Sequence, residues 1–208
     1  MKTVIIIPAR YDSSRFKGKP LAKINGKELV LWTYEIAKKT VGLKNVFIAT
    51  DSKKILSFLS RRKIQVIMTS KKCLTGTDRL AEAAKKIKAD IYINLQGDEP
   101  LVKPSDIRKI IKKKTLFFNH VICGYNIISK NEQPKNKNIP KVVISDSEDL
   151  IYMSRSLVPG TKSNKKKIKY LKQVCIYAFN KAELRSFFNF AKKSNNENLE
   201  DIELLRFL

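Results

Sequence analysis

Short apolar runs alternate with amphipathic segments through the first half of the chain. The apolar runs have strand length and are rich in β-branched residues. They cover residues 3–7, 46–49, 65–68 and 91–95. The segments with helical spacing or helix-capping residues cover residues 30–39, 53–62, 78–87 and 104–114. Strands that alternate with helices in this way predict an α/β fold, with a doubly wound and mostly parallel sheet that is covered on both faces.

After His120 the pattern changes to strand-like pieces that are separated by connections rich in Lys and Asn. The pieces are residues 121–128, 141–144, 151–154 and 174–179, and an apparent helix follows at residues 198–208. This pattern predicts a mixed-sheet second half. A length of 208 residues suits one domain. We therefore expect a single domain, residues 1–208, with a first half of about residues 1–115 and a second of about 116–208.

The charge balance is strongly basic, with 43 Lys and Arg against 19 Asp and Glu and a formal net charge of +24. Such a charge is typical of nucleic-acid binders. Lys outnumbers Arg 34 to 9, however, and the Lys runs contain no interleaved aromatic residues. We interpret most of the charge as solvated surface and expect no nucleic-acid partner, while an anionic small substrate remains compatible with it.

Neither a membrane span nor a metal-binding cysteine cluster is indicated. The first apolar run stops at Pro8, and no run approaches the ~18–20 residues that cross a bilayer. Cys73, Cys123 and Cys175 are odd in number and lack CxxC spacing, and the last two lie in apolar stretches that predict burial. We expect a cytoplasmic protein in a reducing compartment, without a membrane partner and without a catalytic role for His120.

Ligands of doubly wound sheets bind beyond the carboxyl ends of the strands. The loop after the first strand, residues 8–21, carries several cations together with Gly18 and small hydroxyl residues. Backbone N–H groups and cationic side chains are what a polyphosphate requires. The loop lacks the GxxxxGK[ST] pattern of a P-loop, and a basic loop alone is also typical of solvated surface.

A second loop, residues 94–100, places Asp98 and Glu99 just beyond another buried strand, with Gly97 available for a tight turn. A carboxylate in this position suits Mg²⁺ held against phosphates, although Gly-Asp is also common in plain turns. Taken together, the basic loop and the acidic turn predict a Mg²⁺-nucleotide site at one edge of the sheet.

Seven sequence blocks occur in one order from residue 1 to residue 208. They read IPARY…SRFKGKPL (7–21), ATD (49–51), TGTDRLAE (75–82), NLQGDEP (94–100), KVV (141–143), YMSR (152–155) and IY (176–177). In this order they resemble the 3-deoxy-manno-octulosonate (Kdo) cytidylyltransferases, also called CMP-Kdo synthetases. The resemblance implies a Rossmann-like nucleotidyltransferase fold and the reaction of CTP with Kdo to give CMP-Kdo and pyrophosphate, for lipopolysaccharide biosynthesis.

The resemblance also implies a role for each matched residue. Arg10 and Lys19 would neutralise the triphosphate, and Asp98 would hold Mg²⁺; these three are the expected catalytic residues. The expected nucleotide-binding residues are Pro8, Ala9, Arg10, Arg15, Lys19, Gly76, Arg79 and Gln96. The expected sugar-binding residues are Gln96, Arg155, Gln173, Tyr177 and Glu203. Arg155 would suit the sugar carboxylate, and the second half would also form a homodimer contact.

The chain departs from the family pattern at the sugar contacts. Lys17 replaces a proline, Gln173 replaces a histidine, and Leu204 replaces a glutamine. Because Gln173 and Leu204 fall at expected sugar contacts, an amino-Kdo or another nonulosonic acid is the alternative substrate.

Family members continue with a Val-Asp-Thr-Pro-like segment whose Asp is the second Mg²⁺ carboxylate, whereas the given chain stops at Leu208. Asp51 and Glu99 are weaker candidates for that carboxylate. We expect the 208-residue chain to bind Mg²⁺ weakly and to turn over slowly compared with an extended version. A CTP-binding protein with little turnover is therefore a further alternative.

Overall fold

The computed structural model describes residues 1–12, 16–162 and 168–208. Arg15, an expected nucleotide ligand, lies outside the described residues. The chain divides into two compact units: Met1–Ile122 with Cys175–Ala191, and Cys123–Val174 with Lys192–Leu208. Within the described ranges, no helix combines the length and the apolar character needed to cross a membrane.

The first unit is built on five strands in the order β5-β4-β1-β6-β10. Their bounds are β1 (Thr3–Pro8), β4 (Val46–Thr50), β5 (Val66–Met68), β6 (Ile91–Leu95) and β10 (Leu171–Phe179), of which residues 175–179 belong to this unit. The first four strands are parallel, and β10 is antiparallel to β6. Residues 4–7 of β1 are completely buried, as expected for a strand covered on both faces. The predicted α/β fold with a mostly parallel sheet is confirmed.

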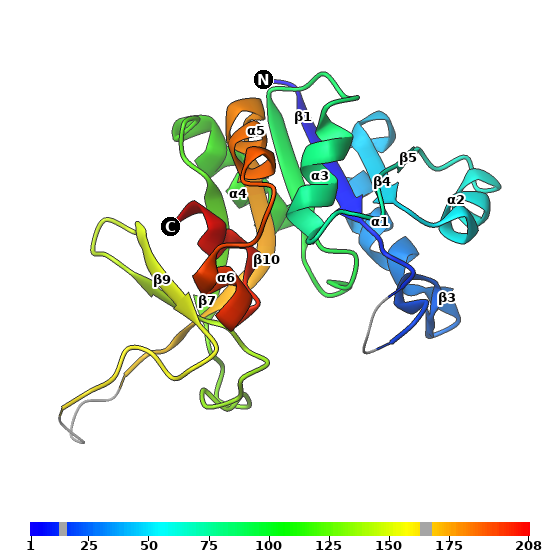
Figure 1. The fold of residues 1–208 in the computed structure, drawn as a ribbon. Coiled ribbons are helices and arrows are strands. Elements are labelled where there is room, and N and C mark those ends of the chain that lie inside the picture. Colours follow the sequence, from blue (N-terminus) through cyan, green and yellow to red (C-terminus); the bar gives the residue numbers. More distant parts are fainter. Residues whose placement is uncertain (13–15, 163–167) are drawn as a thin grey trace. The chain divides into compact units, whose positions relative to one another are not determined.

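Helices cover both faces of this sheet. They are α1 (Leu29–Val41), α2 (Lys53–Ser60), α3 (Gly76–Ala84), α4 (Pro104–Leu116) and α5 (Lys181–Asn189). Helices α3 and α5 pack side by side on one face, and α1 packs with α4 on the other (Figure 1). Ser52 caps α2 by accepting a hydrogen bond from the N–H of Ile55. Smaller elements are the hairpin β2 (Lys23–Ile24) and β3 (Lys27–Glu28) and the 3₁₀ turns η1 (Lys19–Leu21) and η2 (Leu43–Asn45).

The second unit contains short antiparallel strands and the last helices. Its strands are β7 (Ile122–Ile127, of which residues 123–127 belong to this unit), β8 (Lys141–Ile144), β9 (Leu150–Ser154) and residues 171–174 of β10. Its helical elements are α6 (Asn195–Glu200) and the 3₁₀ turn η3 (Glu203–Phe207). Strand β8 pairs antiparallel with both β9 and β10. These antiparallel pairs agree with the mixed sheet that the sequence predicted for the second half.

The expected helix at residues 198–208 is wrong. Helix α6 ends at Glu200 because Asp201 adopts a left-handed conformation (φ 48°), and a 3₁₀ turn follows. The break allows Ile202 to be buried (3% exposed) while Leu199 stays in solvent (84% exposed). After the break, Arg206 of the 3₁₀ turn forms a fully buried ion pair with Glu197 of α6, with 2.7 Å between Nε and Oε2.

The cysteines also differ from expectation. Cys123 and Cys175 are only partly buried, and the buried thiol is that of Cys73. Cys123 shares a face of β7 with Tyr125 and Ile127, which are 40% and 53% exposed, so an apolar stretch here does not mean a core position. Burial raises the pKa of the Cys73 thiol to about 12, which makes this cysteine unreactive.

Candidate nucleotide-binding site

Three backbone segments meet at the carboxyl end of the parallel strands: the end of β1, the turn after β6, and the start of α3. A Cβ atom on Gly76 would lie 3.3 Å from the Pro8 ring and 3.0 Å from the Gln96 amide nitrogen. The structure thus brings together three residues that the sequence assigned to the nucleotide. Ala9 is also buried here, and its N–H donates to the carbonyl of Ala49 at 2.8 Å, which anchors the β1 loop on β4.

Gly97 permits the close approach of the β6 turn to β1. A Cβ atom at this position would lie only 2.9 Å from the backbone oxygen of Pro8, a distance that real Cβ atoms do not adopt. The Thr33 hydroxyl donates to the Gly97 carbonyl at 3.2 Å and holds the turn from the other side. The position of Asp98 therefore depends on a residue without a side chain immediately before it.

The Gly97→Ala variant is expected to lose about 1–3 kcal/mol of unfolding free energy, because the added methyl group overpacks a backbone contact. We also expect weaker CTP binding, since the turn has to move. Chemical denaturation and calorimetric titration with CTP measure the two effects. Gly160→Ala is the matched control, because a Cβ there meets nothing within 4 Å. Wild-type stability and affinity in Gly97→Ala would contradict the proposed contact.

Lys19 and Asp98 form an ion pair across the site, with a distance of 2.5 Å between Nζ and Oδ2. Both side chains are partly accessible, at 41% and 45% exposure. The preceding Gly18 has φ +76° and donates its N–H to the Tyr11 carbonyl at 2.7 Å, which turns the chain before Lys19. Arg10 is exposed at the end of β1. Two predicted triphosphate ligands and the predicted Mg²⁺ ligand thus belong to adjoining loops of one unit.

Helix α3 begins two residues earlier than predicted, at Gly76, because Thr75 and Asp78 form a capping box. The N–H of Thr75 donates to Asp78 Oδ2 at 2.8 Å, and the N–H of Asp78 donates to the Thr75 hydroxyl at 3.2 Å. The Thr-x-x-Asp spacing is a readable signal for such a start. The N-terminus of a helix favours anions, so Gly76 lies where a negatively charged ligand is stabilised.

Arg79 is buried rather than open to a ligand. Its guanidinium is 2% exposed and donates to Asp51 at 2.9 Å, to the Thr69 hydroxyl at 2.5 Å and to the carbonyl of Ser70 at 3.4 Å. It therefore ties the ends of β4 and β5 to α3, and it engages Asp51, one of the weaker candidates for a second metal carboxylate. A direct contact of Arg79 with nucleotide stays a prediction.

Besides Gln96, the first unit contains one more expected sugar residue, Tyr177, which is 2% exposed. It lies opposite Asn94 in the pairing of β10 with β6, and its ring packs edge-on against Phe179 at 6.4 Å. Its contact with a sugar also stays a prediction.

In the second unit, Arg155 closes the end of α6. Its guanidinium donates to the carbonyls of Glu200 (2.5 Å), Lys137 (3.0 Å) and Asp201 (3.0 Å), and its backbone N–H donates to the Glu200 carboxylate at 2.7 Å. Three of the five guanidinium N–H donors are thus directed to backbone. The structure gives Arg155 a structural role, and its pairing with a sugar carboxylate stays a prediction.

Lys141 supports Arg155 and was not singled out by the sequence. Its side chain is fully buried, and Nζ donates to the carbonyls of Arg155 (2.6 Å) and Asn136 (3.1 Å). Burial lowers the pKa of Lys141, and the positive charge of Arg155 lowers it further. Lys141 precedes two valines in a predicted strand, and nothing in that local sequence indicates that its side chain is buried against the Arg155 backbone.

The remaining expected sugar residues also lie in the second unit. Gln173 is partly buried and donates its N–H to the Pro140 carbonyl at 3.0 Å, and Glu203 begins η3. Leu204 is 2% exposed, so its side chain belongs to the core of this unit. The sugar assignments of Gln173 and Glu203 stay predictions.

A Mg²⁺ ion was predicted at Asp98. The described residues contain no group of three or more His, Cys, Asp or Glu side chains that could hold a metal ion on their own. In nucleotide enzymes Mg²⁺ usually takes one or two carboxylates and completes its shell with phosphate oxygens and water. The accessible carboxylate of Asp98, beside the cations of the β1 loop, fits that donor set.

The fold and this strand-end arrangement suit the binding of a nucleotide. A family model described as "Cytidylyltransferase" matches residues 4–208, and the chain belongs to that family. A 3-deoxy-manno-octulosonate cytidylyltransferase of Escherichia coli is 38% identical over 210 residues, which cover 100% of this chain and 83% of the relative. An 8-amino-3,8-dideoxy-manno-octulosonate cytidylyltransferase of Shewanella sp. (strain ANA-3) is 36% identical over 217 residues, covering 100% and 86%.

One solved structure agrees with this assignment, and a second agrees with the fold. A CMP:2-keto-3-deoxy-manno-octonic acid synthetase complexed with CTP superposes with a TM-score of 0.90 at 38% identity, covering 100% of this chain and 85% of that one. A cytidylyltransferase from Leptospira borgpetersenii shares the fold at 17% identity, with a TM-score of 0.58.

Proposed function

We propose that this chain transfers the cytidylyl group of CTP to 3-deoxy-manno-octulosonate, giving CMP-Kdo and pyrophosphate for lipopolysaccharide biosynthesis. The observation that carries the proposal is the TM-score of 0.90, over the whole chain, to a synthetase complexed with CTP. The convergence of Pro8, Gly76 and Gln96, and the ion pair of Lys19 with Asp98 in the same unit, also support it.

Catalysis of this transfer requires mainly that the two substrates are positioned and that the negative charge on the phosphates is stabilised. The anomeric hydroxyl of the sugar attacks the α-phosphorus in line, a P–O bond forms, and the bond from that phosphorus to the bridging oxygen breaks. The hydroxyl proton passes to water, and pyrophosphate leaves. Arg10 and Lys19 would neutralise the charge on the departing phosphates.

Mg²⁺ is the proposed cofactor, and Asp98 is its proposed protein ligand. When bound, it would supply positive charge to the phosphate oxygens. Lys19 pairs with Asp98 in the structure, and a triphosphate would offer Lys19 a second anionic partner. The ion pair therefore holds the Lys19 ammonium and the Asp98 carboxylate at the proposed triphosphate and Mg²⁺ site.

The sugar substrate has two candidates. The relatives named for Kdo and for its 8-amino analogue are similar to this chain at 38% and 36% identity. We favour Kdo because the ordered blocks of the sequence, TGTDRLAE (75–82) and NLQGDEP (94–100) among them, resemble the Kdo enzymes.

We expect pyrophosphate release from CTP and Mg²⁺ with Kdo, at a higher kcat/KM than with the 8-amino sugar. A coupled pyrophosphate assay on the purified chain measures both. Calorimetric titration with CTP, run in parallel, separates a slow enzyme from a CTP-binding protein. Release of pyrophosphate only with UTP, or only with a neutral sugar, would overturn the proposal.

We further propose that the chain forms a homodimer and acts in the cytoplasm. Exposed apolar side chains on the strands of the second unit, namely Tyr125, Ile127 and Ile151, support a self-association surface. Light scattering after size exclusion tests the oligomeric state, and a mass of 23.9 kDa across the micromolar range would exclude the dimer.

A further inference from the structure

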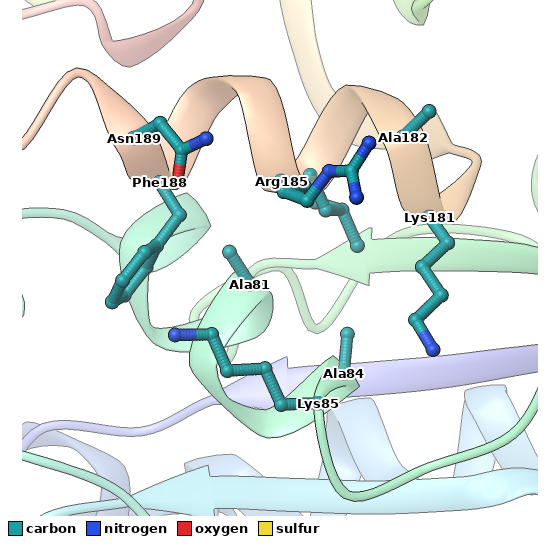
Figure 2. A pocket seen from close by; sticks show the side chains of 9 residues that line it. Ala81, Ala84, Lys85, Lys181, Ala182, Arg185, Phe188 and Asn189 are labelled. Atoms are coloured by element: carbon teal, nitrogen blue, oxygen red, sulfur yellow. The ribbon is translucent and has the colours of Figure 1, made fainter.

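A groove of about 530 Å³ lies between α3 and α5 of the first unit (Figure 2). Its volume falls in the range of ~300–1,000 Å³ that is usual for small-molecule sites. The groove is distinct from the nucleotide-binding site, since Ala84 lies ~12 Å along the helix axis from Gly76. The proposed function does not use it.

The floor of the groove is apolar and tightly packed. Ala81, Ala84 and Leu184 contribute to the lining and are 3%, 2% and 2% exposed. Figure 2 shows the Ala81 and Ala84 methyl groups directed toward α5, with Phe188 at one end of the groove. The small side chains of α3 create the space, and the Phe188 ring bounds it at one end.

Three cations surround this apolar floor. Lys181 and Arg185 are exposed and lie one helical turn apart on α5, and Lys85 reaches in from α3. Figure 2 shows the ammonium groups of Lys85 and Lys181 at opposite ends of the groove. The Lys85 ammonium lies 3.3 Å from the centre of the Phe188 ring, a contact with an aromatic face rather than with an anion.

The acidic residues of the two helices are engaged elsewhere. Asp78 forms the α3 cap, Glu82 accepts from the Ser70 N–H at 2.9 Å, and Glu183 pairs with Lys114 at 2.7 Å. None of the described residues that line the groove is acidic. The groove therefore combines an apolar floor with positive charge that the protein itself does not neutralise.

We propose that this groove binds a small organic anion with a flat, apolar body. The apolar body would lie on the alanine floor against Phe188, and its acidic group would pair with Lys181 and Arg185. Such a ligand gives the two cations an anionic partner, and its own apolar body leaves water for the groove.

The test uses 8-anilinonaphthalene-1-sulfonate as the probe, followed by its fluorescence, with the whole chain. One molecule should bind per chain, and its Kd should rise at least fivefold in Lys181→Gln/Arg185→Gln. The matched control is Arg108→Gln/Lys112→Gln, which removes an exposed Arg and Lys at the same spacing on α4. The Kd of this control should stay within twofold of the wild type.

A second arm uses N-phenyl-1-naphthylamine, which has the same aromatic skeleton without the sulfonate, and it should bind at least fivefold more weakly. Equal Kd values in the two double variants, or equal affinity for the neutral probe, would overturn the proposal. Displacement of the sulfonate by CTP would place the probe in the nucleotide site and would also overturn it. Failure of CTP to bind, measured separately by calorimetry, counts against the proposed function and leaves the groove result intact.

Discussion

The Asp98→Asn variant is expected to release pyrophosphate at least ~100-fold more slowly than the wild-type chain, the usual scale for removing one group that stabilises a developing charge. The substitution keeps the shape of the side chain and removes the negative charge that Mg²⁺ requires. Because Asp98 is 45% exposed, its ion pair with Lys19 is worth little to folding. The melting temperature should therefore change little.

The matched control for this variant is Asp106→Asn. Asp106 lies in the first turn of α4, 4.0 Å from Lys109, and its replacement makes the same change in charge outside the site. Pyrophosphate release is measured over a Mg²⁺ titration for all three proteins, and CTP binding is measured in the presence of a chelator. Rates that fall equally in both variants, or that stay at the wild-type level in Asp98→Asn, would remove Asp98 from the metal site.

The parallel strands could be predicted because their burial on both faces leaves a continuous apolar run. β1 and β6 are examples, and their residues 4–7 and 91–95 are all buried. The loops at their carboxyl ends followed from the topology rule. Pro8, Gly76 and Gln96, which the family resemblance assigned to the nucleotide, lie together there. The continuous apolar runs thus locate the parallel sheet, and the order of strands and helices locates the ligand-binding side at the carboxyl ends of the strands.

Helix α5 was missed although its start carries a readable signal. Asn180 and Glu183 form a capping box, with the N–H of Glu183 donating to the Asn180 amide oxygen at 2.9 Å. The helix has only nine residues, and Leu184 and Phe187 are the two that it buries. Two apolar positions are too few for a periodic pattern, so the cap was the better evidence.

Buried lysines could not be predicted from the sequence. Lys114 lies in a run of three lysines that reads as solvated surface, yet its side chain is completely buried. Its acidic partner, Glu183, is 69 residues away along the chain. Burial of a charge depends on such distant partners, which local patterns do not reveal.

The Lys114→Met variant is expected to lose about 3–5 kcal/mol of unfolding free energy, as is typical when one partner of a buried ion pair is removed. Lys114 Nζ donates to both Glu183 oxygens at 2.7 Å and to the carbonyls of Phe118 (2.7 Å) and His120 (2.8 Å). A methionine fills the space but leaves a buried carboxylate and two carbonyls without this donor. Burial lowers the pKa of Lys114, which shows that desolvation outweighs the attraction of Glu183.

The control is Lys112→Met, the same substitution two residues earlier at an exposed position of α4, which should stay within ~0.5 kcal/mol of the wild type. A double variant, Lys114→Met with Glu183→Gln, separates loss of the pair from loss of packing. It should lose less stability than the sum of the single variants, because the glutamine leaves no buried charge and can still accept from the Asn180 N–H, now 2.7 Å from Glu183. Denaturant unfolding measures the wild type, the control, both single variants and the double variant, and additive losses would show that Lys114 and Glu183 act independently.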